Sequence, residues 1–347
     1  MQRPSHWLRL ATSLILAILL LLPSLATAQD RIYPITGPRA SGKIKTISPA
    51  SIVIEVKGKD QTYPVHEVRK VSFDEEPKEL DRARDQVLNK QYDQALEELR
   101  KIGEVSQPLV KQDVDFYRWY CEGKLGLAGN GDKNAAIRGL LAIASANRNT
   151  HHLYELSELL GQLAMAVNKP TEAIKYFGLL SRSPDATTQA RGVYQLGNVY
   201  LLQNKADEAA AEFAKVSKVS ANTPDMVRLK SLTKIGQALV DNIKGDSAKA
   251  LKSLDDMIKK NDSTDHELFA RISNAKGAIH QKMNKPQRAA LDYLHTDLMF
   301  FTDAEAHAEA LYHLSQLWPQ LGEAARAAEA RERLIKNYAA STWAAKL

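Results

Sequence analysis

Seven alanines recur along this chain, each five residues after an Asn, Gly or Lys that suits a tight turn. Successive alanines are 36 to 41 residues apart. A fixed period of this size predicts a solenoid of helical hairpins, in which each unit buries its apolar face against its neighbours. The alanines are Ala95, Ala136, Ala173, Ala209, Ala250, Ala289 and Ala327. The turn residues are Lys90, Gly131, Asn168, Asn204, Gly245, Asn284 and Gly322.

Residues 1–28 have the layout of a signal peptide. Arg3 and Arg9 are positively charged, an uncharged apolar stretch fills 10–22, and Ala26 and Ala28 give the small-x-small cleavage pattern. The apolar stretch is shorter than the roughly 20 residues that span a bilayer. We therefore expect an exported protein, periplasmic or secreted, with no stable membrane insertion after cleavage. An uncleaved anchor is the alternative.

The charge pattern bears on which partners are expected. The formal net charge is +6, and it falls to +4 without Arg3 and Arg9. Acidic and basic residues are interspersed along the helical segments, as on solvated helix faces, and form no basic stripe. We expect no nucleic-acid partner.

Residues 29–77 are predicted to form a small β module. Short runs rich in Val, Ile, Thr and Tyr cover 42–47, 51–57, 61–65 and 67–73, and turn residues such as Gly58 separate them. Four or five short antiparallel strands predict an SH3-like or Sm-like barrel, or a curled sheet. A module this small is marginal alone, so we expect it to dock on the first helical hairpin.

Residues 78–347 are predicted to form seven helical hairpins. In the clearest unit Gly197 and Tyr200 lie on a first helix, and Ala209 and Phe213 lie on the second. This pattern resembles the tetratricopeptide repeat (TPR) of exported bacterial proteins, over about residues 80–347. The resemblance implies a mainly α, TPR-like solenoid, with an α-solenoid of another repeat type as the alternative. Gly236 lies two residues early relative to its alanine, so a longer turn is expected in that unit.

The resemblance also implies a binding surface. In this family, peptides lie in a concave groove lined by the first helix of each hairpin. We place the groove positions of the family on this chain by counting from Gly197 and from Gly277, and this gives the predicted partner contacts. They are Arg191, Tyr194, Asn198, Arg271, Asn274 and Gln281. Ordinary polar surface without a dedicated role is the alternative for these residues.

Signals for catalysis or metal binding are weak. His151 and His152 are adjacent, and adjacent residues point about 100° apart on a helix, so we expect no shared ion there. For the histidines and carboxylates of 295–313 we expect a hydrogen-bonded network, with a metal site as the alternative. The sequence has no phosphate-binding glycine loop and no nucleophile motif. The expectation is no enzyme, no cofactor and no metal.

These observations together favour a non-enzymatic scaffold or adaptor that binds proteins or peptides in the bacterial cell envelope. The alternative function is a cell-wall glycan-binding or outer-membrane assembly component that uses the β module for recognition. A homo-oligomer through the terminal unit at 321–347 is left open.

Overall fold

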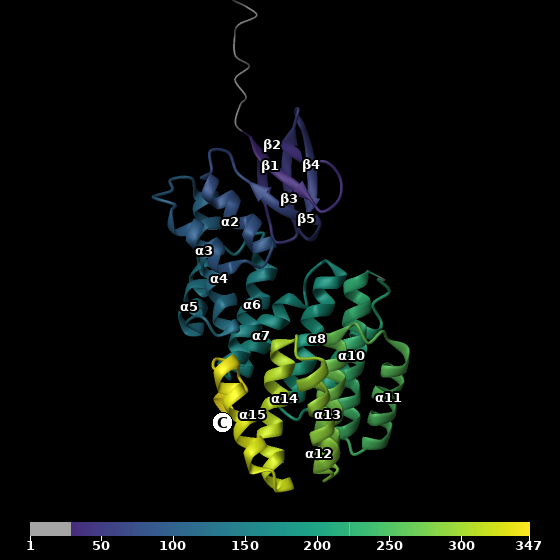
Figure 1. Cartoon of the computed structure of the whole chain (residues 1–347). Helices are drawn as coiled ribbons and strands as arrows, with labels where there is room; N and C mark the ends of the chain where they lie inside the picture. Colours follow the sequence, from purple (N-terminus) through teal and green to yellow (C-terminus); the bar gives the residue numbers. More distant parts are fainter. Residues whose placement is uncertain (1–28, 222) are drawn as a thin grey trace, which may run out of the picture.

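A computed structural model describes residues 29–221 and 223–347. In this part of the chain an antiparallel sheet precedes fourteen α-helices, and the sheet lies at one end of the helical stack (Figure 1). The predicted signal peptide lies outside the described residues. None of the described helices is both long enough and apolar enough to cross a membrane.

The sheet has five strands in the order β4-β3-β2-β1-β5, and all neighbours are antiparallel. Strands β4 and β5 form its two edges and do not pair, so the sheet is open and not a closed barrel. The predicted runs correspond to β2–β5, while β1, which begins with two charged residues and ends with a proline, carried no strand pattern. The strands are β1 (Asp30–Pro34), β2 (Ala40–Ile47), β3 (Ser51–Val56), β4 (Lys59–Pro64) and β5 (Val68–Ser72), with the short helix η1 (Val65–Glu67) before β5.

The helices pair into seven consecutive hairpins, as the repeat predicted. The first five helices after the sheet are α2 (Lys78–Leu88), α3 (Tyr92–Arg100), α4 (Pro108–Ala128), α5 (Lys133–Ala146) and α6 (Leu153–Ala166). The next five are α7 (Pro170–Leu180), α8 (Ala186–Leu202), α9 (Ala206–Ser217), α10 (Pro224–Ile243) and α11 (Ser247–Lys260). The last are α12 (His266–Lys282), α13 (Pro286–Met299), α14 (Ala304–Leu317) and α15 (Ala324–Tyr338), with short helices η2 (Trp318–Leu321) and η3 (Ala344–Lys346).

The turn residues behave as the pattern predicted, with one exception. Six of the seven adopt a left-handed backbone, with φ between 55° and 98°. That conformation ends a helix and favours Gly or Asn. In the second hairpin Gly129, with φ 99°, takes this role in place of Gly131. The predicted turn there is wrong by two residues, because α4 ends at Ala128 and a longer connection follows.

The recurring alanines lie at the contact between paired helices. Six of them are fully buried, from Ala95 to Ala289. The seventh, Ala327, is only partly buried, and Ala330 is the buried alanine of that helix. The last hairpin thus buries Ala330 and Leu334 of its second helix in place of Ala327.

Glycines on first helices accommodate aromatic rings from second helices. A Cβ atom on Gly197 would lie 2.4 Å from the ring of Phe213, and the same relation joins Gly161 to Phe177. Gly236 approaches Phe213 from the next hairpin, at 2.5 Å for an added Cβ. Helices α10 and α11 are separated by three residues, as α8 and α9 are. The expectation of a longer turn after Gly236 is therefore wrong.

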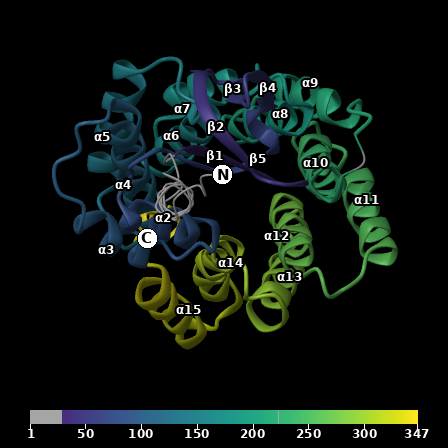
Figure 2. The same ribbon diagram turned by 90° about the horizontal axis from the view of Figure 1, so that it is seen from above.

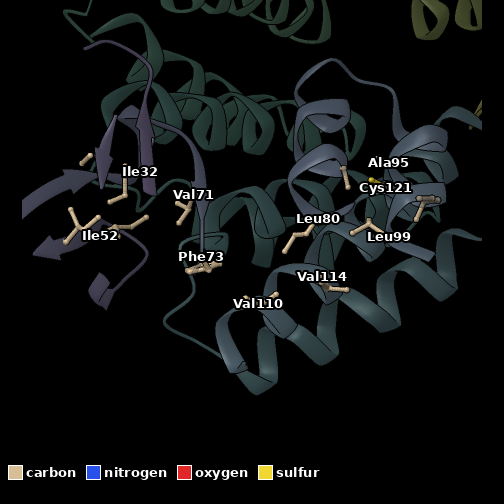
Figure 3. Close-up of a cluster of buried hydrophobic side chains, with 14 of the residues drawn as sticks. Ile32, Ile52, Val71, Phe73, Leu80, Ala95, Leu99, Val110, Val114 and Cys121 are labelled. Atoms are coloured by element: carbon tan, nitrogen blue, oxygen red, sulfur yellow. The ribbon is translucent and has the colours of Figure 1, made fainter. Parts of the chain in front are cut away.

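The sheet shares one hydrophobic core with the first hairpins (Figure 3). Ile32 and Ile52 of the sheet are fully buried in this cluster, as are Leu80 of α2 and Leu99 of α3. The core continues to Val114 of α4. The β module is thus docked on the first hairpin, as its small size led us to expect.

Seen from above, the hairpins curve around a common axis and outline a ring (Figure 2), and Figure 1 shows the last hairpins below the first ones. Lys133 of α5 donates a hydrogen bond from Nζ to the carbonyl oxygen of Ala340, at 2.7 Å. A Cβ added to Gly129 would lie 2.9 Å from the Ala340 side chain. The segment after α15 therefore contacts the second hairpin, 207 residues earlier in the chain.

Candidate functional site

The inner face of the ring is formed by the first helix of successive hairpins. Figure 2 shows α4, α6, α8, α10, α12 and α14 nearer the centre and their partner helices outside. This arrangement follows from the repeat, because each first helix packs on the next first helix as well as on its own partner. The predicted contact residues lie on two of these inner helices, α8 and α12.

Helix α8 carries three of the predicted contacts. Arg191 is half-exposed and lies 3.2 Å from a carboxylate oxygen of Glu158 on α6. Tyr194 is partly buried, with its ring 6.1 Å from that of Phe213. Asn198 is partly buried and its amide makes no hydrogen bond within the described chain. Positions three, four and seven apart share one helix face, so these three side chains lie side by side.

Helix α12 carries the other three, and they are already engaged. Arg271 lies 3.3 Å from Glu267, 3.5 Å from Asp303 and 3.6 Å from Glu305. The Gln281 side-chain oxygen accepts a hydrogen bond from the Tyr293 hydroxyl at 2.9 Å. Because these contacts occupy their polar groups, Arg271 and Gln281 offer a ligand fewer hydrogen bonds than the residues of α8 do.

Asn274 is the most enclosed of the six. It is 2% exposed, and its Nδ2 donates to the Ala306 carbonyl at 2.8 Å and to Glu309 at 2.9 Å. Its Oδ1 accepts from the Thr296 hydroxyl at 2.7 Å. Asn274 therefore joins α12, α13 and α14, and we leave it out of the contact surface proposed below.

A carboxyl with an unusual protonation equilibrium lies beside Asn274. Burial raises the pKa of Glu309 to about 7, although the hydrogen bond from Asn274 acts in the opposite direction. Four residues further along α14, the His313 ring stacks on Tyr293 with centroids 4.6 Å apart. Burial lowers the pKa of His313 to about 4. Near pH 6 the side chains of Glu309 and His313 are therefore mostly neutral, and the charged groups Arg271, Glu305 and Lys346 lie around them.

The polar residues of 295–313 form the expected hydrogen-bonded network. His307 makes a 2.7 Å contact through Nε2 with Asp297 and another 2.7 Å contact through Nδ1 with the Tyr338 hydroxyl. Arg333 donates two hydrogen bonds to the same Asp297 carboxylate, at 2.6 and 3.0 Å. The network ties α13 and α14 to the last helix.

A second polar network lies at the junction of the sheet and the first hairpins. Arg84 of α2 is 1% exposed. It donates two hydrogen bonds to Glu76, both at 2.8 Å, and two to Asp113 of α4, at 2.8 and 3.2 Å. A guanidinium can hold two carboxylates in this way because its donors form a planar fork. The buried guanidinium is thereby bonded to both carboxylates.

The network continues from Asp113 to the residues before α6. His152 Nε2 lies 3.2 Å from Asp113 Oδ1, and His152 Nδ1 lies 3.0 Å from Glu155. Burial lowers the pKa of His152, but Asp113 and Glu155 more than offset this and raise it to about 8. Burial lowers the pKa of His151 to about 3, and His152 adds to that effect.

The expectation that His151 and His152 point apart is wrong. Both precede α6, which begins at Leu153, so helical spacing does not apply to them. Their rings lie 3.8 Å apart, and both Nε2 atoms face Asp113. Asp113 and Arg84 were missed by sequence reasoning. The available signal was that each places a charge on the apolar stripe of its helix, Asp113 between Val110 and Val114.

The fold defines a class: the chain is a TPR-like helical repeat protein with an added open β sheet. Among solved structures it is similar to a tetratricopeptide repeat protein from Parabacteroides merdae ATCC 43184, with 18% identity and a TM-score of 0.53 over 75% of this chain and 92% of that one. It is also similar to a Rap protein complexed with Competence and Sporulation Factor, with 14% identity and a TM-score of 0.55 over 76% of each chain. Neither a family model nor a curated protein sequence matches the chain.

Proposed function

We propose that the protein is a non-enzymatic scaffold that binds a protein or peptide segment on the inner face of the ring, centred on α8. The observation that carries the proposal is Asn198, a partly buried amide with an unused donor and an unused acceptor on that face. An amide of this kind can bond the N–H and the C=O of an extended peptide backbone at once.

The neighbours of Asn198 add to its binding capacity. Arg191 keeps donors beyond its contact with Glu158, because a guanidinium carries five N–H groups. Tyr194 offers the exposed part of an aromatic ring, a type of side chain that dominates binding energy at many interfaces. The similar Rap protein was solved in complex with Competence and Sporulation Factor, and so a fold of this kind is compatible with binding.

The test uses site-specific photocrosslinking in cells. A photoreactive amino acid is placed at Asn198 on the inner face or at Glu208, an exposed residue on α9. Crosslinked partners identified by mass spectrometry are expected from position 198 and not from position 208. Equal capture at both positions would contradict binding on the inner face.

A double variant gives a second readout. Arg191→Ala with Asn198→Ala is expected to abolish capture of the partner found by crosslinking. The matched control, Glu208→Ala with Lys218→Ala, changes two exposed residues of the same hairpin and is expected to leave capture unchanged. Unchanged capture by the inner-face variant would disprove the proposal.

We also propose that this scaffold works outside the cytoplasm, in the envelope of a bacterial cell or secreted from it. The proposal rests on the sequence of 1–28 alone, with its charged start, apolar stretch and cleavage pattern. N-terminal sequencing of the protein from its native cells is expected to begin at Gln29. A chain that retains residue 1 in the cytoplasmic fraction would contradict export.

A further inference from the structure

We propose that Asp113, His151 and His152 form a binding site for a divalent transition metal ion of the zinc type. One ligand atom from each of the three side chains lies within 4.8 Å of the other two. Two imidazoles and one carboxylate are a donor set that suits Zn²⁺ better than Mg²⁺ or Ca²⁺, which prefer oxygen ligands only. Three protein ligands leave the fourth position of a tetrahedral ion for one further ligand.

The separations match those between ligands of one ion. Ligands about 2.0–2.2 Å from a tetrahedral Zn²⁺ are about 3.4 Å from one another. Asp113 Oδ1 lies 3.2 Å from Nε2 of His152 and 3.9 Å from Nε2 of His151. Both distances exceed the mode for a good hydrogen bond, about 2.9 Å. Small side-chain rotations would bring all three atoms to one ion.

The surroundings orient the ligands as supporting groups do in metal sites. His152 faces Glu155 through Nδ1 at 3.0 Å, so that its Nε2 is directed at Asp113. Metal-bound histidines usually donate their second ring N–H to a carboxylate in this way. Arg84 holds the other oxygen of Asp113 at 2.8 Å, which fixes the carboxylate and leaves Oδ1 for the ion.

Charge balance points the same way. Metal ligation requires neutral histidines. With His151 and His152 neutral, the buried side chains of Glu76, Asp113 and Arg84 together carry one net negative charge. A cation beside Asp113 would offset that charge, and uncompensated buried charge is costly. The ion would link α4 of the second hairpin to the start of the third.

The decisive experiment measures metal directly. The full chain without a polyhistidine tag is incubated with Zn²⁺, dialysed into metal-free buffer and examined by elemental analysis. About one zinc per chain is expected. No zinc above the buffer level would overturn the proposal and leave a network of hydrogen bonds alone.

A variant separates specific from adventitious binding. His151→Ala is the mildest change, because the contact of His151 with Asp113 is 3.9 Å long and not a hydrogen bond. It is expected to lose zinc retention while its circular dichroism stays that of the unaltered protein. The control His66→Ala removes a half-exposed histidine of η1 and is expected to retain zinc. Equal retention by both variants would place the zinc elsewhere and overturn the assignment.

Substitution of cobalt adds a geometric readout. Co²⁺ bound by these residues is expected to show the visible absorption of a tetrahedral complex, which a merely structural network cannot produce. Glu155→Gln keeps the shape of the positioning residue and is expected to weaken Co²⁺ binding 10–100-fold. An octahedral spectrum, or an unchanged affinity in Glu155→Gln, would contradict the site as described.

Discussion

Within the repeats an aromatic ring lies on a glycine of the neighbouring helix, whereas at the junction with the sheet a buried arginine lies between two carboxylates. Phe213 touches Gly197 of its own hairpin and Gly236 of the next, and both contacts are apolar. Arg84 contacts Glu76 and Asp113, and both contacts are ionic. Like units can stack by one repeated apolar fit, but a sheet joined to a helical stack has no repeat to use. The junction instead combines the apolar core that the sheet shares with the first hairpins and the buried ion pairs of Arg84.

The largest effect is expected from removing the junction arginine. Arg84→Met leaves Glu76 and Asp113 buried without their partner and is expected to lower the free energy of unfolding by about 3–5 kcal/mol. Hydrogen exchange of α2 and α4 in increasing urea measures this locally. The control Arg82→Met removes a half-exposed arginine of the same helix, and a change within about 1 kcal/mol is expected. Similar losses in both variants would remove the distinction between junction and surface charges.

The apolar fit within the repeats is tested by filling a glycine. Gly197→Ala places a Cβ 2.4 Å from the Phe213 ring and is expected to lower the free energy of unfolding by about 1–3 kcal/mol. Gly178→Ala, also within a helix, meets nothing within 4 Å and is expected to raise it by about 0.5–1 kcal/mol. Urea denaturation of both variants gives the comparison. The same sign for both would show that the glycine–aromatic contact is not tight.

A polar contact inside the repeats gives a pH test. The pKa of Glu309 is about 7 in the folded chain, above its unfolded value, so the folded state binds the extra proton. Stability from this group is therefore present at pH 5 and is lost as the pH rises to 8, by about 1–2 kcal/mol. Neighbouring Glu305 raises this pKa further, whereas Arg271 and Lys346 lower it.

Substitution of Glu309 isolates its contribution to the pH dependence of stability. Glu309→Gln keeps an acceptor for Asn274 and is expected to flatten the dependence of urea stability on pH between 5 and 8. The control Glu305→Gln removes an exposed carboxyl of the same helix and is expected to keep most of the slope. Parallel curves for the unaltered protein and Glu309→Gln would show that this carboxyl does not titrate in that range.

The smallest effect is expected at the closure of the ring. Lys133→Met removes the hydrogen bond to Ala340 and is expected to cost about 0.5–1.5 kcal/mol. Faster hydrogen exchange over 339–347 is the measurement. Lys111→Met, which removes an exposed ion pair with Asp115, serves as control and is expected to leave that segment unchanged.

Repetition explains how much of the fold could be read from the sequence. The alanines and the left-handed turn residues recur seven times, so each weak signal was supported by the others. Strands β2–β5 lie in runs rich in β-branched and aromatic residues bounded by turn residues, but β1 lies in no such run and was missed. The ring closure was not predictable, because Lys133 and Ala340 are 207 residues apart and belong to no pattern.

The candidate site residues were likewise predictable where one helix positions them, and not where contacts from other segments do. Counting from Gly197 placed Arg191, Tyr194 and Asn198 on one helix face, because helical spacing fixes their directions. The same count at α12 could not show that Asn274 is enclosed, since its partners come from two other helices. The meeting of His151 with Asp113 depends on the backbone just before α6, and helical spacing gave the wrong direction there.

The contact between the two ends of the array depends on the number of units. Open repeat arrays can gain or lose a hairpin by duplication or deletion, since each unit contacts only its neighbours. Here the segment after α15 contacts the second hairpin. An added hairpin would move Ala340 away from Lys133, and in an array of six hairpins Ala340 would not reach Lys133. Change in copy number, the usual evolutionary freedom of a solenoid, would therefore break the contact between the two ends of the array.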